Sequence, residues 1–129
     1  MPVRRLNNLY QHEFGNFVRM NKILLFNPRS ANYKPRIPNS ILSVASSVEG
    51  RYDYVIVDGN LEHNPEGKIL NYLSTGEFKY FGCTCMPGPQ LKQAIPISKK
   101  IREEFPGVTI MGWIFSIKST ESCFRIWLC

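Results

Sequence analysis

The sequence lacks the motifs by which several common cofactors are held. No G-x-G-x-x-G follows the first apolar run and no G-x-x-x-x-G-K-[ST] occurs in the 129 residues, so neither a dinucleotide cradle nor a P-loop is predicted. The four cysteines form neither a C-x-x-C pair nor a C-x-x-x-C-x-x-C cluster, so no metal site is predicted. Cys83 and Cys85 are expected on alternate faces of a strand, as small core residues that do not share an ion. His12 and His63 are interpreted as surface residues.

Long apolar runs and concentrated charge are also lacking. No segment approaches the ~18 to 20 apolar residues of a membrane helix, and no apolar block follows the first arginines, as a secretory signal requires. We therefore expect a soluble, cytoplasmic protein without a membrane partner. The net charge of +6 is scattered, and Lys99, Lys100 and Arg102 are followed at once by Glu103 and Glu104. That pattern is typical of a solvated helix face, so no nucleic-acid partner is predicted.

What the sequence has is an alternation of short apolar runs and amphipathic segments. Helices between the runs return the chain across the sheet, which makes the strands parallel and the crossovers right-handed. The alternation predicts an α/β domain with a Rossmann-like (flavodoxin-like), doubly wound, mainly parallel sheet of about four to five strands and helices on both faces. The expected strands lie in the apolar runs 22–28, 52–58, 78–86 and 108–111, and the expected helices cover 38–49, 64–73 and 90–105.

Punctuating residues mark the ends of these elements. Asn64 is a predicted N-cap with Pro65 at the first helical position, and Gly50 ends the first helix. Pro96 lies inside the last helical pattern and removes a backbone hydrogen bond, so we expect a kink or a late helix start.

Ligands of doubly wound sheets collect beyond the carboxyl ends of the strands, where the strand order reverses. The candidate cofactor-binding residues are therefore those at the strand ends, and no catalytic residue is predicted. They are Asn27, Pro28, Asp58, Asn60, Thr84, Met86, Pro87 and Gly88.

Each of these residues also has a structural interpretation. Asp58 could hold a ribose hydroxyl, yet an Asp followed by Gly-Asn is as often a turn former. Thr84 and the backbone near Gly88 could hold polar ligand groups beside an apolar shelf of Met86 and Pro87. A plain strand-to-helix turn would place them in the same way.

Four segments follow one another in the order K-I-L-L-F-N-P, I-P-N-S-I-L-S-V-A-S-S-V-E-G, Y-D-Y-V-I-V-D-G-N-L-E and F-G-C-T-C-M-P-G-P-Q-L-K-Q-A-I-P-I-S. This succession resembles the N-terminal cobalamin-binding domain of cobalamin-dependent radical S-adenosylmethionine enzymes. It covers residues 22 to about 111 and rests on the order of segments. The resemblance implies a cobalamin partner and a following radical S-adenosylmethionine barrel with an iron–sulfur cluster, which is missing from these residues. The D-x-H-x-x-G motif of methionine-synthase-like domains is absent, so no histidine is offered to cobalt.

The two ends fit this resemblance less well. Residues 1–21 are expected to be an N-terminal extension, 22–116 a truncated domain and 117–129 an atypical tail. Instead of the W-G-G-Y-x-P-S-like turn implied after the last strand, the sequence reads M-G-W-I-F-S-I-K-S. One added nucleotide after the codon of Met111 would restore such a turn, so the hypothesis is that residues 112–129 are read out of frame.

A function of another class shares the predicted fold. A receiver-like or flavodoxin-like signalling or interaction domain has the same doubly wound sheet, and the fold alone does not choose among these functions. A receiver needs an Asp at the end of the third strand, where this chain has Thr84-Cys85-Met86. A flavodoxin needs a Ser/Thr/Gly-rich phosphate loop after the first strand, which R-S-A-N-Y-K-P-R matches poorly.

Overall fold

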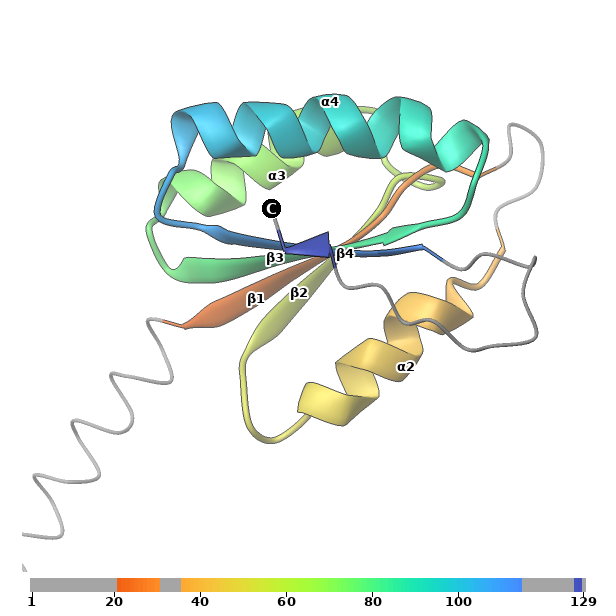
Figure 1. Cartoon of the computed structure of the whole chain (residues 1–129). Coiled ribbons are helices and arrows are strands. Elements are labelled where there is room, and N and C mark those ends of the chain that lie inside the picture. The colour runs from red at the N-terminus through yellow and green to blue at the C-terminus, as the bar shows by residue number, and fades with distance from the viewer. Residues whose placement is uncertain (1–20, 31–35, 115–126, 129) are drawn as a thin grey trace, which may run out of the picture.

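A five-stranded sheet covered by three helices forms the described part of the chain. The computed structural model describes residues 21–30, 36–114 and 127–128. The elements are β1 (Lys22–Asn27), α2 (Asn39–Val48), β2 (Tyr54–Asp58), α3 (Pro65–Ser74), β3 (Phe78–Cys85), α4 (Pro89–Glu104), β4 (Thr109–Ile114) and β5 (Trp127–Leu128). The sheet order is β2-β1-β3-β4-β5, with β1 to β4 parallel and β5 antiparallel to β4 (Figure 1). The predicted doubly wound α/β fold is confirmed.

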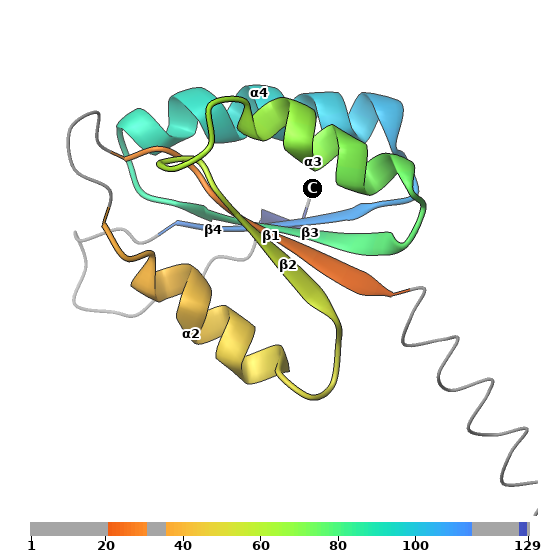
Figure 2. The same ribbon diagram turned by 180° about the vertical axis from the view of Figure 1, so that it is seen from behind.

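The helices lie on both faces of the sheet. Figures 1 and 2 show α2 alone on one face and α3 with α4 on the other. β1 is buried on both faces, because Leu24 and Phe26 pack in the cluster with α3 and α4, whereas Ile23 and Leu25 pack in the cluster with α2. This arrangement explains why the run K-I-L-L-F-N is almost entirely apolar instead of alternating.

The predicted punctuation of α2 and α3 is confirmed. α3 begins after Asn64, whose side-chain Oδ1 accepts a hydrogen bond of 2.9 Å from the Gly67 N–H, and Pro65 takes the first helical position. Gly50 follows the last residues of α2 with φ of +74°, a conformation that glycine adopts without strain. The start of α3 and the end of α2 therefore lie where local chemistry favours them.

α4 differs from the expectation in its start. It begins at Pro89 and continues through Pro96 to Glu104, so the predicted late start is wrong. The first turn tolerates Pro89 because its missing N–H has no partner within the helix there. Pro96 lies on the exposed side, and the buried side presents Ala94, Ile97 and Ile101 to the sheet. β4 also extends further than predicted, to Ile114.

An irregularity at the start of β3 sets its register. Lys22 pairs with Phe78 but Ile23 pairs with Tyr80, so Lys79 is an extra residue in β3. Phe78 and Phe81 therefore both pack on the face of α3 and α4.

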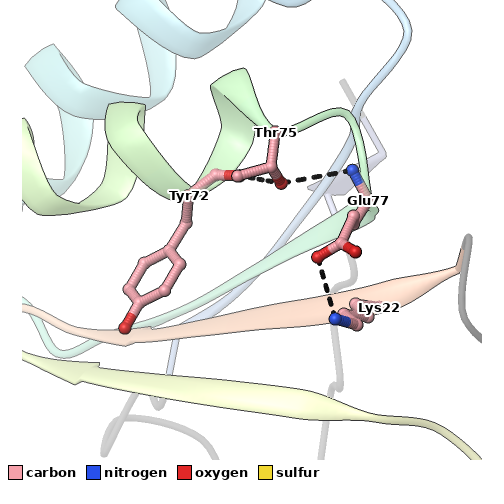
Figure 3. A network of polar contacts seen from close by, with 4 residues as sticks. All are labelled: Lys22, Tyr72, Thr75 and Glu77. Atoms are coloured by element: carbon pink, nitrogen blue, oxygen red, sulfur yellow. Dashed lines mark hydrogen bonds and ion pairs between the residues drawn. The ribbon is translucent and has the colours of Figure 1, made fainter.

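The turn before β3 is tied to β1, because the Glu77 carboxylate lies 2.8 Å from Lys22 Nζ (Figure 3). The Thr75 hydroxyl donates to the Tyr72 carbonyl at 2.7 Å and accepts from the Glu77 N–H at 3.4 Å.

Within the described ranges, no helix combines the length and the apolar composition needed to span a membrane.

Candidate functional site at the carboxyl edge of the sheet

The carboxyl ends of the first three strands lie side by side. Asn27 pairs with Asp58 on β2, and Phe26 pairs with Cys83 on β3, so the three exits share one edge of the sheet. The strand order reverses between β1 and β3, since the chain leaves β1 toward β2 and leaves β3 toward β4. This is the place at which doubly wound proteins hold their ligands.

Four of the predicted site residues form one continuous hydrogen-bonded set, which we call the edge network: Asn27, Asp58, Asn60 and Thr84. The Thr84 hydroxyl donates to Asn27 Oδ1 at 3.2 Å, and Asn27 Nδ2 donates to Asp58 Oδ1 at 3.0 Å. The Asn60 backbone N–H and side-chain amide each donate to the same Asp58 oxygen at 3.0 Å. The edge network thus spans β3, β1 and β2.

Burial divides the edge network into two parts. Asn27 and Thr84 are buried, and buried polar groups require partners, which they supply to each other. Asp58 and Asn60 are half-buried. All the side-chain hydrogen bonds of Asp58 with described residues go to Oδ1. Oδ2 makes no hydrogen bond with another described residue.

Asp58 also forms the turn after β2. Its carbonyl accepts from the N–H groups of Leu61 and Glu62 at 3.1 and 3.0 Å, and its side chain accepts from the Asn60 N–H. The turn-forming interpretation is therefore confirmed, and a ligand-binding role for the second carboxylate oxygen stays a prediction.

Gln90 joins the two loops beside the point of strand reversal, and sequence reasoning missed it. Its side-chain Nε2 donates to the carbonyl of the buried Pro28 at 3.0 Å, and its Oε1 accepts from the Met86 N–H at 2.7 Å. Gln90 is buried. The only sequence signal was its place in the first turn of the helix that follows a candidate strand end.

Arg29 and Gln93 are further residues that sequence reasoning missed at this edge. Gln93 Oε1 accepts from the Arg29 N–H at 2.8 Å, and the guanidinium donates to the carbonyls of Gly59 and Glu62 at 2.9 and 3.1 Å. In the described residues no carboxylate pairs with Arg29. A positive charge therefore lies at the edge without an ionic partner there.

The remaining candidates form an exposed loop between β3 and α4. Met86 is 48% exposed, Pro87 and Gly88 are exposed, and Gly88 has φ of +120°. The predicted apolar shelf of Met86 and Pro87 is thus on the surface beside the edge network.

The prediction that Cys83 and Cys85 lie on alternate faces is wrong. Residues two apart in a strand share a face, and the two Sγ atoms are 3.8 Å apart in the cluster under α4. Both thiols are buried, as predicted for core residues. The hydrogen bond between the two thiols, and then burial, raise the pKa of Cys83, while the same hydrogen bond lowers the pKa of Cys85 against the opposing effect of burial.

A hollow of about 580 Å³ lies at the opposite, amino edge of the sheet. Its apolar lining comes from Leu73, Phe78, Phe105 and Val108, at the ends of α3 and α4. It lies at the end of the sheet opposite the edge network, and none of the candidate ligand-binding residues lines it. No three His, Cys, Asp or Glu side chains gather in the described part of the chain. His63 is exposed, and His12 lies outside the described residues.

The chain was compared with protein-family models, with curated proteins and with solved structures, and none of them matches it.

Proposed function

We propose that the domain is a cobalamin-binding module of a radical S-adenosylmethionine enzyme and is not catalytic by itself. The single observation that supports this function is the edge network, which offers polar groups across three neighbouring strands at the edge where such folds hold ligands. The order of segments that resembles the cobalamin-binding domains supplies the identity of the ligand.

The residues at the edge fit cobalamin lying across it. Asp58 Oδ2 suits a hydroxyl or amide N–H of the ligand, the Arg29 guanidinium suits its phosphate, and Met86 with Pro87 suits the apolar face of the corrin ring. Gln90 bridges the loops after β1 and β3, which holds the two ligand-facing loops in a fixed relation to each other. Bound cobalamin would supply the alkyl-cobalt chemistry, while the iron–sulfur cluster and S-adenosylmethionine belong to the barrel of the parent enzyme.

The residues that would hold cobalamin contact it through backbone groups and short side chains. They are Asn27, Pro28, Asp58, Asn60, Thr84, Met86, Pro87 and Gly88, with Arg29 added by the structure.

The test is retention of hydroxocobalamin by the purified full chain. After mixing and gel filtration, we expect the red chromophore to elute with the protein at about one equivalent. Asp58→Asn should weaken binding about ten- to a hundredfold, because a hydrogen bond to a charged group is worth roughly 1.5–3 kcal/mol. Asp53→Asn is the matched control at the other end of β2 and should bind as the unmodified chain does. Colourless protein at micromolar concentrations would overturn the proposal.

The same experiment addresses the signalling or interaction alternative. Retention of flavin mononucleotide in place of cobalamin would favour a flavodoxin-like domain. Resequencing the gene downstream of Met111 tests the link to a parent enzyme, since a C-x-x-x-C-x-x-C in another frame would support it. An intact frame on both strands would remove the hypothesis that residues 112–129 are out of frame.

A further inference from the structure

The hollow of about 580 Å³ at the amino edge of the sheet takes no part in the proposed function, and we call it the amino-edge hollow. Leu73 and Phe78 of its wall belong to the larger core cluster, and Phe105 and Val108 pack against that cluster while staying half-buried. The amino-edge hollow is therefore an open end of the hydrophobic core.

The size and the lining of the amino-edge hollow favour an apolar occupant. Gly107 belongs to its wall, and a Cβ atom there would meet no atom within 4 Å, so the space beside it is open. The volume lies within the range of about 300–1,000 Å³ in which proteins hold small ligands. Because exposed apolar surface of this kind marks interaction sites, a side chain or ligand of apolar character fits it best.

The chain enters the fold through the wall of the amino-edge hollow. Asn21 lines it, is 7% exposed and directly precedes β1. Residues 1–20 lie outside the described residues and are joined to Asn21. A tethered segment meets a neighbouring surface at an effective concentration of millimolar order. The residues just before Asn21 therefore have an advantage over any separate partner.

The sequence of residues 1–20 carries a matching apolar pattern. Five apolar residues are spaced by three or four positions, namely Val3, Leu6, Tyr10, Phe14 and Phe17. This spacing predicts a helix with one apolar side. Phe17 precedes Asn21 by four residues, which span at most about 14 Å of extended chain. The end of the apolar side can therefore reach the amino-edge hollow.

Charge at the rim agrees with this occupant. Glu104 lines the amino-edge hollow and forms no ion pair with another described residue. Arg19 precedes Asn21, which lines the same wall, by two residues. Opposite charges at the rim of an interface fix its orientation more than its affinity. The pair would thus select one orientation of the segment.

We propose that residues 14–19 dock in the amino-edge hollow of their own chain, with their apolar side on its wall and the Arg19 guanidinium at Glu104. The N-terminal segment then closes the open end of the core. This inference does not depend on cobalamin, because the amino-edge hollow lies at the end of the sheet opposite the edge network.

The test replaces Phe17 of the full chain by the photoreactive residue p-benzoylphenylalanine. After irradiation, mass spectrometry of peptides should find the cross-link on residues 73–79 or 104–108, in a species with the mass of one chain. The matched control carries the same photoreactive residue in place of Asn16, on the polar side of the predicted helix, and should form little of this cross-link. Circular dichroism verifies that both proteins are folded.

Three outcomes would overturn the proposal. A cross-link on another part of the chain would place the segment elsewhere, and equal cross-linking from positions 16 and 17 would show that no side of the segment faces the amino-edge hollow. A cross-linked species with the mass of two chains would assign the amino-edge hollow to a second copy.

The rim provides a second measurement. Glu104→Arg should lower the yield of the cross-link from position 17 about threefold, because an exposed attractive pair of modest strength becomes a repulsive one. Glu103→Arg makes the same change on the neighbouring residue of α4, which does not line the amino-edge hollow, and should leave the yield unchanged. Equal yields in the two variants would overturn the proposed contact of Arg19 with Glu104.

Discussion

Gly59 lies where the loops after β1 and β2 meet α4. A Cβ atom there would be 2.5 Å from Gln93 Oε1, 2.9 Å from the Arg29 backbone N and 3.1 Å from the Asn27 carbonyl oxygen. The Gly59 N–H also donates to that Asn27 carbonyl at 2.7 Å. The close approach of the loops after β1 and β2 therefore depends on a residue without a side chain.

Gly59→Ala should destabilise the fold by about 1–3 kcal/mol, because the added methyl separates Arg29 from Gln93 and overpacks two backbone groups. Urea unfolding measures the change. Gly107→Ala is the control, since no atom lies within 4 Å of the added methyl and it should change stability little. Equal unfolding midpoints for the two variants would contradict the close packing at Gly59.

The cysteine pair gives a second prediction at the residue scale. Cys85 is the more exposed thiol, and its hydrogen bond with Cys83 lowers its pKa, whereas the pKa of Cys83 is raised. Cys85 should therefore be alkylated before Cys83, because the thiolate is the reactive form. Its rate should rise with pH and level off at a lower pH than for an ordinary thiol. Peptide mapping over a time course measures both rates.

Cys83→Ala removes the thiol that lowers the pKa of Cys85, so the pKa of Cys85 should rise and its alkylation at neutral pH should slow. An unchanged rate in this variant would show that the hydrogen bond is not the cause of the shift.

At the scale of the elements, α3 shows why helix boundaries were predictable. Asn64 and Pro65 act through contacts within one helical turn, so sequence alone identified them. The start of α4 was misjudged because Pro96 was expected to kink the helix or to delay its start, whereas the helix begins at Pro89 and continues through the exposed Pro96 with Ile97 and Ile101 buried. Local signals thus predict a helix end well, but packing on the sheet decides whether a helix passes an internal proline.

Asn64→Ala should cost about 1 kcal/mol of stability, because the Gly67 N–H loses its acceptor at the start of α3. Chemical denaturation is the measurement. Asn71→Ala, in the exposed middle of the same helix, makes the same change without removing a cap and should be neutral or slightly stabilising. A loss for Asn71→Ala as large as that for Asn64→Ala would argue against the cap.

At the scale of the whole molecule, the described residues cover the two faces of the sheet unequally. The cluster under α3 and α4 contains twelve buried residues, whereas the cluster under α2 contains four, namely Ile23, Leu25, Ile41 and Ala45. α2 also has no side-chain cap and no acidic residue in its first turn. The Ser46 and Ser47 hydroxyls donate to the Ser43 carbonyl within the same helix. The α2 face is therefore the weaker half of the fold.

Amide hydrogen exchange should detect this difference. We expect amides in the middle of α2 to exchange about ten- to a hundredfold faster than those of α4 and β1, because few buried contacts oppose local opening of α2. Mass spectrometry of exchanged peptides resolves the three elements. Equal protection of α2 and α4 would contradict the unequal packing.

The sequence by itself determined the alternation of elements, the parallel sheet and the edge at which Asn27, Asp58 and Thr84 meet, because periodicity and turn residues act locally and parallel strands share their exits. The sequence also implies that Cys83 and Cys85 share a face of the sheet, because side chains alternate along a strand and these residues are two apart. The prediction of alternate faces was therefore wrong on the sequence itself. Only the tertiary structure decided how the loops are joined. Gln90, Gln93 and Arg29 bond to groups 30 to 64 residues away in the chain, and such contacts exist only once α4 has packed across the sheet and brought the three strand ends together.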